Sequence, residues 1–173
     1  MKKDISLQNF INQFIIDDIK PIVENHAYLA FVLLSAAIEF LGKCLSNADD
    51  WQTLGESEYD FCNAIQTCPS LNKYKVKFGE STTVKGHNNV YKNKLYKELR
   101  CAMVHALQPN SDIVLGRERN DLENNIIGCR ELYEDVVKAC EHIKSMNISK
   151  NTTVYVDGDT TGSTSTMHLH IEK

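Results

Sequence analysis

The sequence predicts a mainly helical bundle that carries two small β-hairpins, and three observations support this fold class. Long segments place apolar residues three and four positions apart, which is the period of a helix that faces a core. A hydrophobic content of 42% and a charged content of 24% over 173 residues are typical of a soluble globular protein. Two other segments show the pattern of short strands. We expect one domain over residues 1–173, with residues 151–173 as a C-terminal appendage.

The first two helices are expected over residues 5–20 and 22–46. The first carries an apolar stripe, and Pro21 should end it. The second is apolar almost all round, which predicts the central, buried helix of the bundle. Ser35 and Glu39 interrupt its apolar run, so we do not expect it to span a membrane.

Two further helices are predicted at residues 57–67 and 117–146. Ser57 is a suitable N-cap for the shorter helix, and Pro69 should stop it. The longer helix has apolar residues at helical spacing and should close the bundle, with Gly128 tolerated inside it at some cost.

The two β-hairpins are expected at about residues 73–86 and 152–171. In the first, Lys alternates with an apolar residue from Lys73 to Phe78, which is a strand pattern. The second should pack on the helices or pair with another strand, because an isolated hairpin is marginally stable. His168 and His170 share one face of it, so they are either a polar strand face or half of a metal site.

The chain has its most informative stretch between Val90 and Leu107, where neither Gly nor Pro interrupts a helix. A core-facing stripe is formed there by Leu95, Leu99, Ala102, Met103 and Ala106. Arg100 and His105 are five positions apart, so they lie about 140° from each other on the helix and flank the side that faces away from the core.

The outward side of this helix carries Lys97, Cys101 and Val104. A small, mildly apolar strip between an Arg and a His suggests that another surface covers it, for example a second copy of the chain. The simpler alternative is that Arg100 and His105 are ordinary surface residues near a helix end, where a His favours the helix dipole. The spacing alone does not decide between these interpretations.

A basic block precedes this pair. Residues 71–100 carry a net charge of +6 in a chain whose net charge is −4, which favours a phosphate-bearing ligand. The candidates for contacting RNA are Lys73, Lys75, Lys77 and Lys97. The alternative is a hairpin edge that Lys residues protect from aggregation.

Residues 95–105, Leu-Tyr-Lys-Glu-Leu-Arg-Cys-Ala-Met-Val-His, resemble the signature helix of HEPN domains, a family of small all-helical proteins. The motif of that family is an Arg followed four to six residues later by a His. Residues 36–45 also resemble the second long helix of bacterial members. The resemblance covers the helical layout of residues 5–147. Many members carry Asn, Asp or His directly after the Arg, and this chain has Cys101 there.

The resemblance implies a metal-independent endoribonuclease in which Arg100 and His105 are catalytic. His105 would deprotonate the ribose 2′-hydroxyl, and Arg100 would stabilise the charge on the attacked phosphate. Glu39 is a candidate acid that orients one of the two, or else a structural ion pair or an exposed flank, and Cys101 is a further candidate to contact the pair. The resemblance also implies a homodimer, and the outward strip places the helix with Cys101 and Val104 at its interface.

The same resemblance suggests a bacterial toxin or antiphage defence setting, with an antitoxin or defence-system protein as partner. The main alternative is a non-catalytic helical module that binds RNA, a nucleotide or a protein, with Cys101 marking a degraded site. No metal and no cofactor are expected. No secretion signal is recognised, so we expect a cytoplasmic protein whose six cysteines are reduced, without membrane association.

Overall fold

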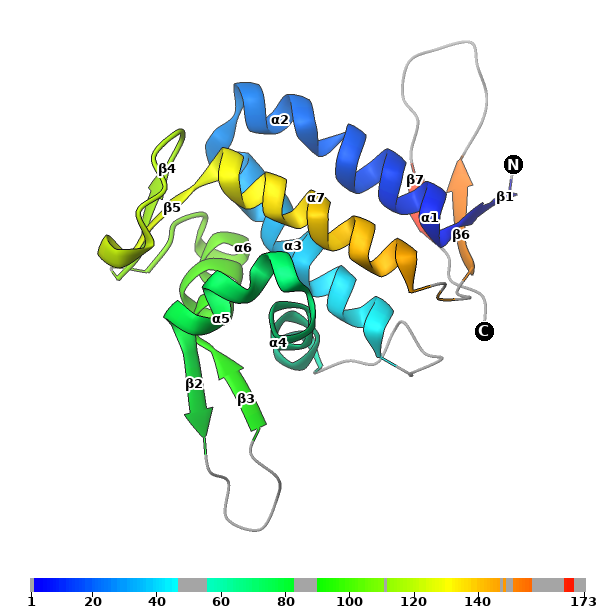
Figure 1. Cartoon of the computed structure of the whole chain (residues 1–173). Coiled ribbons are helices and arrows are strands. Elements are labelled where there is room, and N and C mark those ends of the chain that lie inside the picture. The colour runs from blue at the N-terminus through cyan, green and yellow to red at the C-terminus, as the bar shows by residue number, and fades with distance from the viewer. Residues whose placement is uncertain are drawn as a thin grey trace.

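Helix α3 (Ala27–Leu45) forms the centre of the bundle, as predicted for the long apolar segment. Helices α2 (Ile19–Asn25), α4 (Ser57–Thr67) and α7 (Cys129–Ser145) pack against it (Figure 1). The computed structural model describes residues 2–46, 56–82, 90–110, 112–146, 148, 151–156 and 167–169. One cluster of buried apolar side chains joins these helices, so the described chain is mainly helical around a shared core.

Among the described residues, α3 is the one helix that is long and apolar enough to cross a membrane. Within its most apolar window, 56% of the residues are buried inside the bundle. Such burial is compatible with the core helix of a soluble protein.

Helices α3 and α4 approach each other closely at Gly42. A Cβ atom at this position would collide with the backbone carbonyl oxygen of Asp60. The side-chain amide of Asn63 donates to the Gly42 carbonyl oxygen at 3.4 Å, which also links the two helices. Glycine therefore sets the distance between the central helix and its neighbour.

The N-terminal segment differs from the predicted single helix over residues 5–20. It forms a strand and then three consecutive helical pieces, which are β1 (Lys2–Ser6), α1 (Leu7–Phe10), the π-helix η1 (Ile11–Asp17) and α2. Pro21 does not end the helix, because it lies in the first turn of α2, where its missing N–H is not needed. The helical path breaks instead at His26, whose φ of −136° and ψ of 58° are not helical.

The predicted strand from Lys73 to Phe78 is wrong. Residues Asn72–Phe78 form helix α5, which follows α4 and the short 3₁₀ helix η2 (Pro69–Leu71). The buried residues Leu71, Tyr74 and Phe78 are spaced three and four apart, and Val76 is 77% exposed. The helical spacing of the large residues therefore overrides the alternation of Lys with apolar neighbours. Helix α4 matches the prediction, although Glu56 rather than Ser57 is its N-cap.

A hairpin follows α5 and leads into the motif helix. Strand β2 (Gly79–Thr82) pairs with β3 (Val90–Asn93) in antiparallel register, and the hairpin projects from the bundle (Figure 1). The predicted helix from Val90 therefore starts later, as η3 (Tyr96–Cys101) and α6 (Ala102–Ala106). Buried Asn93 makes the turn: its side-chain oxygen accepts from the N–H of Leu95, and its amide donates to the Tyr74 carbonyl.

The predicted long helix over residues 117–146 begins only at Cys129. The preceding chain forms a short parallel ladder of β4 (Val114–Gly116) and β5 (Ile126–Gly128), with the 3₁₀ helix η4 (Leu122–Asn124) between them. Gly128 is the N-cap of α7 rather than a residue inside a helix. Its N–H donates to the side-chain oxygen of Asn120 at 2.8 Å, which fixes this start.

The expected C-terminal hairpin is present as strands β6 (Asn151–Val156) and β7 (Met167–Leu169). Strand β1 pairs with β6, so the sheet order is β1–β6–β7. This bears out the expectation that the hairpin would find another strand. The hypothesis of a metal site at His168 and His170 lies outside the described side chains.

All six cysteines are reduced thiols, as predicted. Five are buried, and Cys101 is partly exposed. Burial raises the pKa of Cys62, Cys68 and Cys129 to about 11, so these thiols remain protonated near neutral pH.

Candidate functional site

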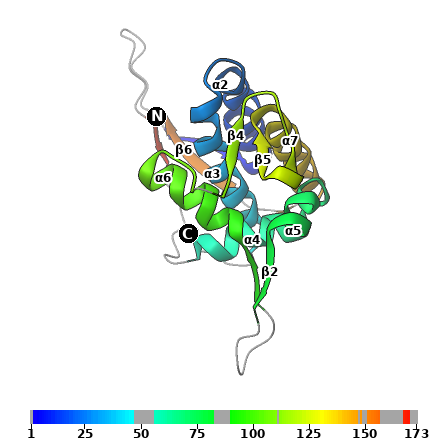
Figure 2. The same cartoon turned by 90° about the vertical axis from the view of Figure 1, so that its left-hand side faces the viewer.

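Arg100 and His105 lie on one short helix of mixed geometry. Its first part, η3, is a π-helix that continues directly into the α-helix α6. The N–H of Ala102 donates to the carbonyls of both Leu99 and Lys97, so the change of geometry comes directly after the Arg100–Cys101 pair. π-helical segments are rare and occur frequently at functional sites. Figure 2 faces α6, with α3 behind it.

Arg100 is held by the central helix. Its Nε donates to Oε2 of Glu39 at 2.5 Å, and the two side chains are 18% and 20% exposed. Of the roles considered for Glu39, the structure shows an ion pair with Arg100 rather than an exposed flank. A paired carboxylate on a mostly buried helix satisfies both charges and fixes the direction of the guanidinium group.

The aromatic ring of Tyr96 also contacts Arg100. The guanidinium carbon lies 5.9 Å from the centre of the Tyr96 ring, which is within the range of a cation–π contact. Burial, and then a hydrogen bond with Cys101, raise the pKa of Tyr96 to about 12. The structure therefore brings Glu39, Tyr96, Arg100 and Cys101 together as one cluster.

His105 has a different environment. It is exposed, and its side chain makes no hydrogen bond or ion pair within the described part of the chain. No direct interaction between the Arg100 and His105 side chains is found there either. An exposed imidazole on a helix remains available to exchange a proton with a bound molecule.

The end of the helix that carries His105 is anchored to α3. Leu107 ends α6 with a positive φ of 53°, and the hydroxyl of Tyr28 donates to its carbonyl oxygen at 2.5 Å. Glu39 and Tyr28 are eleven positions apart on α3, or about three helical turns, so one face of α3 holds both the middle and the C-terminal end of the motif helix. Sequence analysis did not identify Tyr28 and Tyr96 as site residues. The spacing of Tyr28 and Glu39 places both on one helix face, which is a sequence pattern that indicates a shared contact surface.

Of the predicted outward strip of Lys97, Cys101 and Val104, the apolar Val104 is exposed as expected, whereas Cys101 is only partly exposed. Val104 is 38% exposed and Leu107 is 64% exposed. Tyr28 and Leu29 on α3 are also about half exposed. Tyr28 contacts Leu107, which lies about one helical turn after Val104. We name these four exposed apolar residues near His105 the α6 patch.

The four candidate lysines are separated by the fold. Lys73 lies on α5 and forms ion pairs with Glu131 and Asp135, so its charge is neutralised. Lys77 donates to the Glu123 carbonyl at 3.0 Å. Only Lys97 shares the helix of Arg100, and it is exposed. Lys75 is partly exposed on α5.

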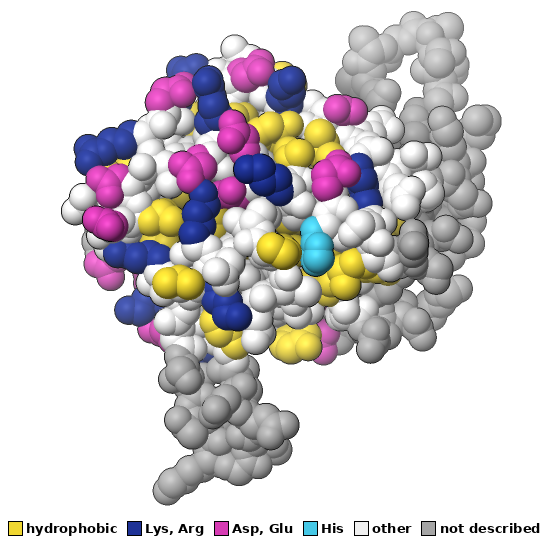
Figure 3. Space-filling model, viewed as in Figure 1, with side chains coloured by type: hydrophobic (Ala, Val, Ile, Leu, Met, Phe, Trp, Pro, Cys, Tyr) yellow, Lys and Arg dark blue, Asp and Glu magenta, His cyan; other side chains and the backbone are white. Residues whose placement is uncertain are grey.

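The surface over α5 and α7 is mixed in charge. On the face in Figure 3, Lys and Arg side chains alternate with Asp and Glu side chains. The sequence block of net charge +6 therefore does not form a uniformly basic patch on this face.

The site was also considered as a metal site, and the chain was compared with known proteins. Within the described ranges, no group of three or more His, Cys, Asp or Glu residues is placed to hold a metal ion. Neither a family model, nor a curated protein, nor a solved structure matches this chain, so membership of the HEPN family stays a prediction.

Proposed function

We propose that this chain is a metal-independent endoribonuclease with a single HEPN-like helical domain. One observation carries the proposal: Arg100, on a π-to-α helix, is held by Glu39, and the same helix presents an exposed His105. Arg is suited to bind a phosphate through paired donors, and His is suited to move a proton near neutral pH. The resemblance of residues 95–105 to the HEPN motif supports the same reaction.

The reaction needs only the groups of the chain and the RNA. Neutral His105 accepts the proton of the ribose 2′-hydroxyl, and the 2′-oxygen attacks the adjacent phosphorus. The bond from phosphorus to the 5′-oxygen breaks, and that oxygen takes a proton from an imidazolium or from water. Arg100 stabilises the additional negative charge on the phosphate oxygens. The products are a 2′,3′-cyclic phosphate and a 5′-hydroxyl end, and DNA is not cut because it lacks the 2′-hydroxyl.

A homodimer would complete the site. Arg100 is turned toward α3, and His105 is exposed without a partner among the described residues, so one protomer presents the two groups in different directions. A two-fold contact through the α6 patch, which includes Val104, would bring two copies of each group into one cleft. Exposed apolar side chains at this position favour such a contact.

The biological setting follows from the resemblance alone. We propose a bacterial toxin or antiphage defence protein that acts in the cytoplasm. Its activity would be restrained by an antitoxin or by another protein of the defence system.

The test is cleavage of a labelled single-stranded RNA in the presence of EDTA. Wild type should produce cyclic-phosphate ends, and His105→Ala should abolish them without changing the melting temperature, because His105 is exposed. His26→Ala is the matched control, since His26 is also exposed and makes no capping hydrogen bond. Cleavage that persists in His105→Ala, or that is lost on chelation in wild type, would refute the mechanism.

A second candidate is a non-catalytic module that binds RNA, a nucleotide or a partner protein. The Glu39 carboxylate favours it, because it already compensates the charge of Arg100 and so weakens its attraction for phosphate. This candidate would be favoured over the enzyme if folded wild-type protein binds varied RNAs in a salt-dependent way and cuts none of them.

A further inference from the structure

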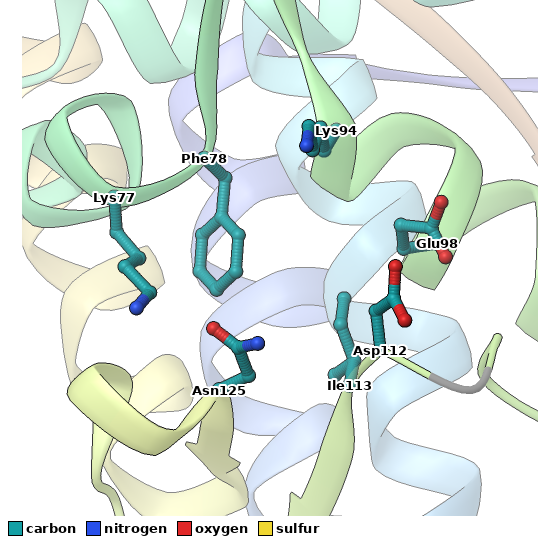
Figure 4. Close-up of a pocket in the computed structure, with 7 residues that line it drawn as sticks. All are labelled: Lys77, Phe78, Lys94, Glu98, Asp112, Ile113 and Asn125. Atoms are coloured by element: carbon teal, nitrogen blue, oxygen red, sulfur yellow. The ribbon is translucent and has the colours of Figure 1, made fainter.

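A separate cavity of about 250 Å³ lies where η3 meets the end of α5 (Figure 4). Its apolar floor is formed by Phe78 and Ile113, which are 6% and 4% exposed. Its polar walls come from three other segments, with Glu98 on η3, Asp112 before β4, and Asn125 after η4. This volume is below that of a site for a drug-sized ligand, so the cavity suits a single small ring system.

Three polar side chains of the cavity are not engaged by other residues that the structure describes. Within the described part of the chain, no hydrogen bond or ion pair engages the carboxylates of Glu98 and Asp112 or the side-chain amide of Asn125. Figure 4 shows the two carboxylates side by side at one end of the cavity. Glu98 and Asn125 are half-buried and Asp112 is exposed, so these groups are accessible to a molecule that enters the cavity.

The backbone holds these groups in place. The N–H of Asn110 donates to the Glu98 carbonyl at 3.1 Å, which holds Asn110 against η3. Asn125 has a positive φ of 57°, and its backbone carbonyl accepts from the N–H of Val114. These two backbone hydrogen bonds therefore link the segments that carry Glu98 and Asn125 to their neighbours in the fold.

The chemistry of the walls selects the ligand. An ionised carboxylate only accepts hydrogen bonds, so Glu98 and Asp112 need a molecule with neighbouring N–H donors. Among the RNA bases, guanine alone presents two such donors on its Watson–Crick edge, at N1 and at the exocyclic amine. Its O6 and N7 atoms are acceptors that suit amide or ammonium donors. The side-chain amide of Asn125 supplies such a donor. At the rim, Lys77 donates to the Glu123 carbonyl and Lys94 pairs with Glu80, and each ammonium group has three N–H donors, so both keep donors for a ligand.

We infer that this cavity binds a guanine base. Its four charged side chains balance formally, so a phosphate attached to the base is not repelled. Phe78 and Ile113 form the apolar surface against which the ring packs.

The position of the cavity suggests its use. Glu98 precedes His105 by seven residues on the same continuous helix, which is about two turns and roughly 10 Å along the axis. A nucleotide whose base occupies the cavity can therefore place a phosphate near His105. The role as a base subsite rests on the proposed function, and it predicts cleavage next to guanosine.

Binding is tested by isothermal titration with the four ribonucleoside 3′-monophosphates. Guanosine 3′-monophosphate should bind at least about tenfold tighter than the uridine, cytidine and adenosine compounds, because a well-placed pair of base contacts supplies that discrimination. Glu98→Gln and Asp112→Asn should each remove most of this preference. Glu134→Gln, an exposed substitution on α7, is the matched control and should keep it. Equal affinity for all four nucleotides in wild type would overturn the inference, as would an unchanged preference in both cavity variants.

Mapping the cut sites on a mixed-sequence RNA separates the two proposals. Cleavage next to guanosine that becomes unselective in Glu98→Gln supports the subsite. Cleavage without base preference, together with unselective nucleotide binding, overturns the guanine cavity and leaves the ribonuclease. Selective binding of guanosine 3′-monophosphate without cleavage of any RNA keeps the cavity and refutes the ribonuclease.

Discussion

The ion pair between Glu39 and Arg100 should couple the central helix to the motif helix energetically. The two side chains are about one-fifth exposed, and their charged atoms are 2.5 Å apart. Exposed pairs contribute between zero and about 1 kcal/mol, whereas removing one partner of a fully buried pair costs about 3–5 kcal/mol. For this intermediate burial we expect a coupling free energy of about 1–2 kcal/mol between the two residues.

A double-mutant cycle measures this coupling. Glu39→Ala, Arg100→Ala and the double variant are unfolded in urea, and the coupling is the non-additive part of their free energies of unfolding. The contact of Arg100 with the Tyr96 ring is lost in both Arg100 variants, so it cancels from the cycle. The matched control is the pair of Arg130 and Glu118, whose side chains are 60% and 59% exposed. Its coupling should stay below about 0.5 kcal/mol.

Two results would refute this reasoning. A coupling free energy for Glu39 and Arg100 as small as that of the control pair would mean that this largely buried ion pair does not hold the motif helix. A gain in stability of Glu39→Ala would mean that desolvation of the carboxylate exceeds its attraction to the guanidinium.

Three further predictions concern other parts of the molecule. Gly42→Ala should lower the free energy of unfolding by about 2 kcal/mol or more, because the new Cβ meets the Asp60 carbonyl oxygen; an unchanged urea midpoint would contradict the close helix approach. Burial, and then the neighbouring Cys44, raise the pKa of the Cys140 thiol from 9.0 to about 12, so unfolding releases its proton and stability should fall as pH rises from 9.0 towards 12. Cys140→Ala should flatten this slope in urea titrations, and an identical slope would exclude the thiol as its source. Val104→Arg should give monomers by light scattering if the α6 patch joins two copies, and an unchanged dimer mass would place the interface elsewhere.

Apolar periodicity predicted α4 and the buried central position of α3 correctly, because large buried residues dominate both segments. The expected start of the central helix at residue 22 was wrong, because the helical path breaks at His26. It failed at α5, where three lysines alternate with Tyr74, Val76 and Phe78. Of these three, Val76 is exposed, so the alternation was accidental, and the helical spacing of Tyr74 and Phe78 with Leu71 was the real signal. Where a segment shows both a helical and a strand period, its secondary structure depends on which of its residues the rest of the bundle can bury.

The candidate site was predictable in its residues but not in its contacts. Arg100 and Glu39 were both singled out from the sequence, yet their pairing depends on how the motif helix crosses α3. The bond from Tyr28 to Leu107 depends on a positive φ at a leucine, which ordinary backbone preferences disfavour. The sequence around Leu107 does not predict this positive φ. The guanine cavity likewise draws its walls from segments that meet only in the folded chain.

The pairing of β1 with β6 has a consequence for how the protein is made. Strand β1 precedes the helices in the chain, so all the described helices must be synthesised before β6 can pair with it. Contacts between such distant segments form late in folding, because closing a long loop costs chain entropy that only the finished bundle offsets. The helical core can therefore assemble on the nascent chain with β1 still unpaired. Chaperones or proteases that recognise exposed strands would have access to β1 during that interval, so synthesis rate can influence the yield of folded protein.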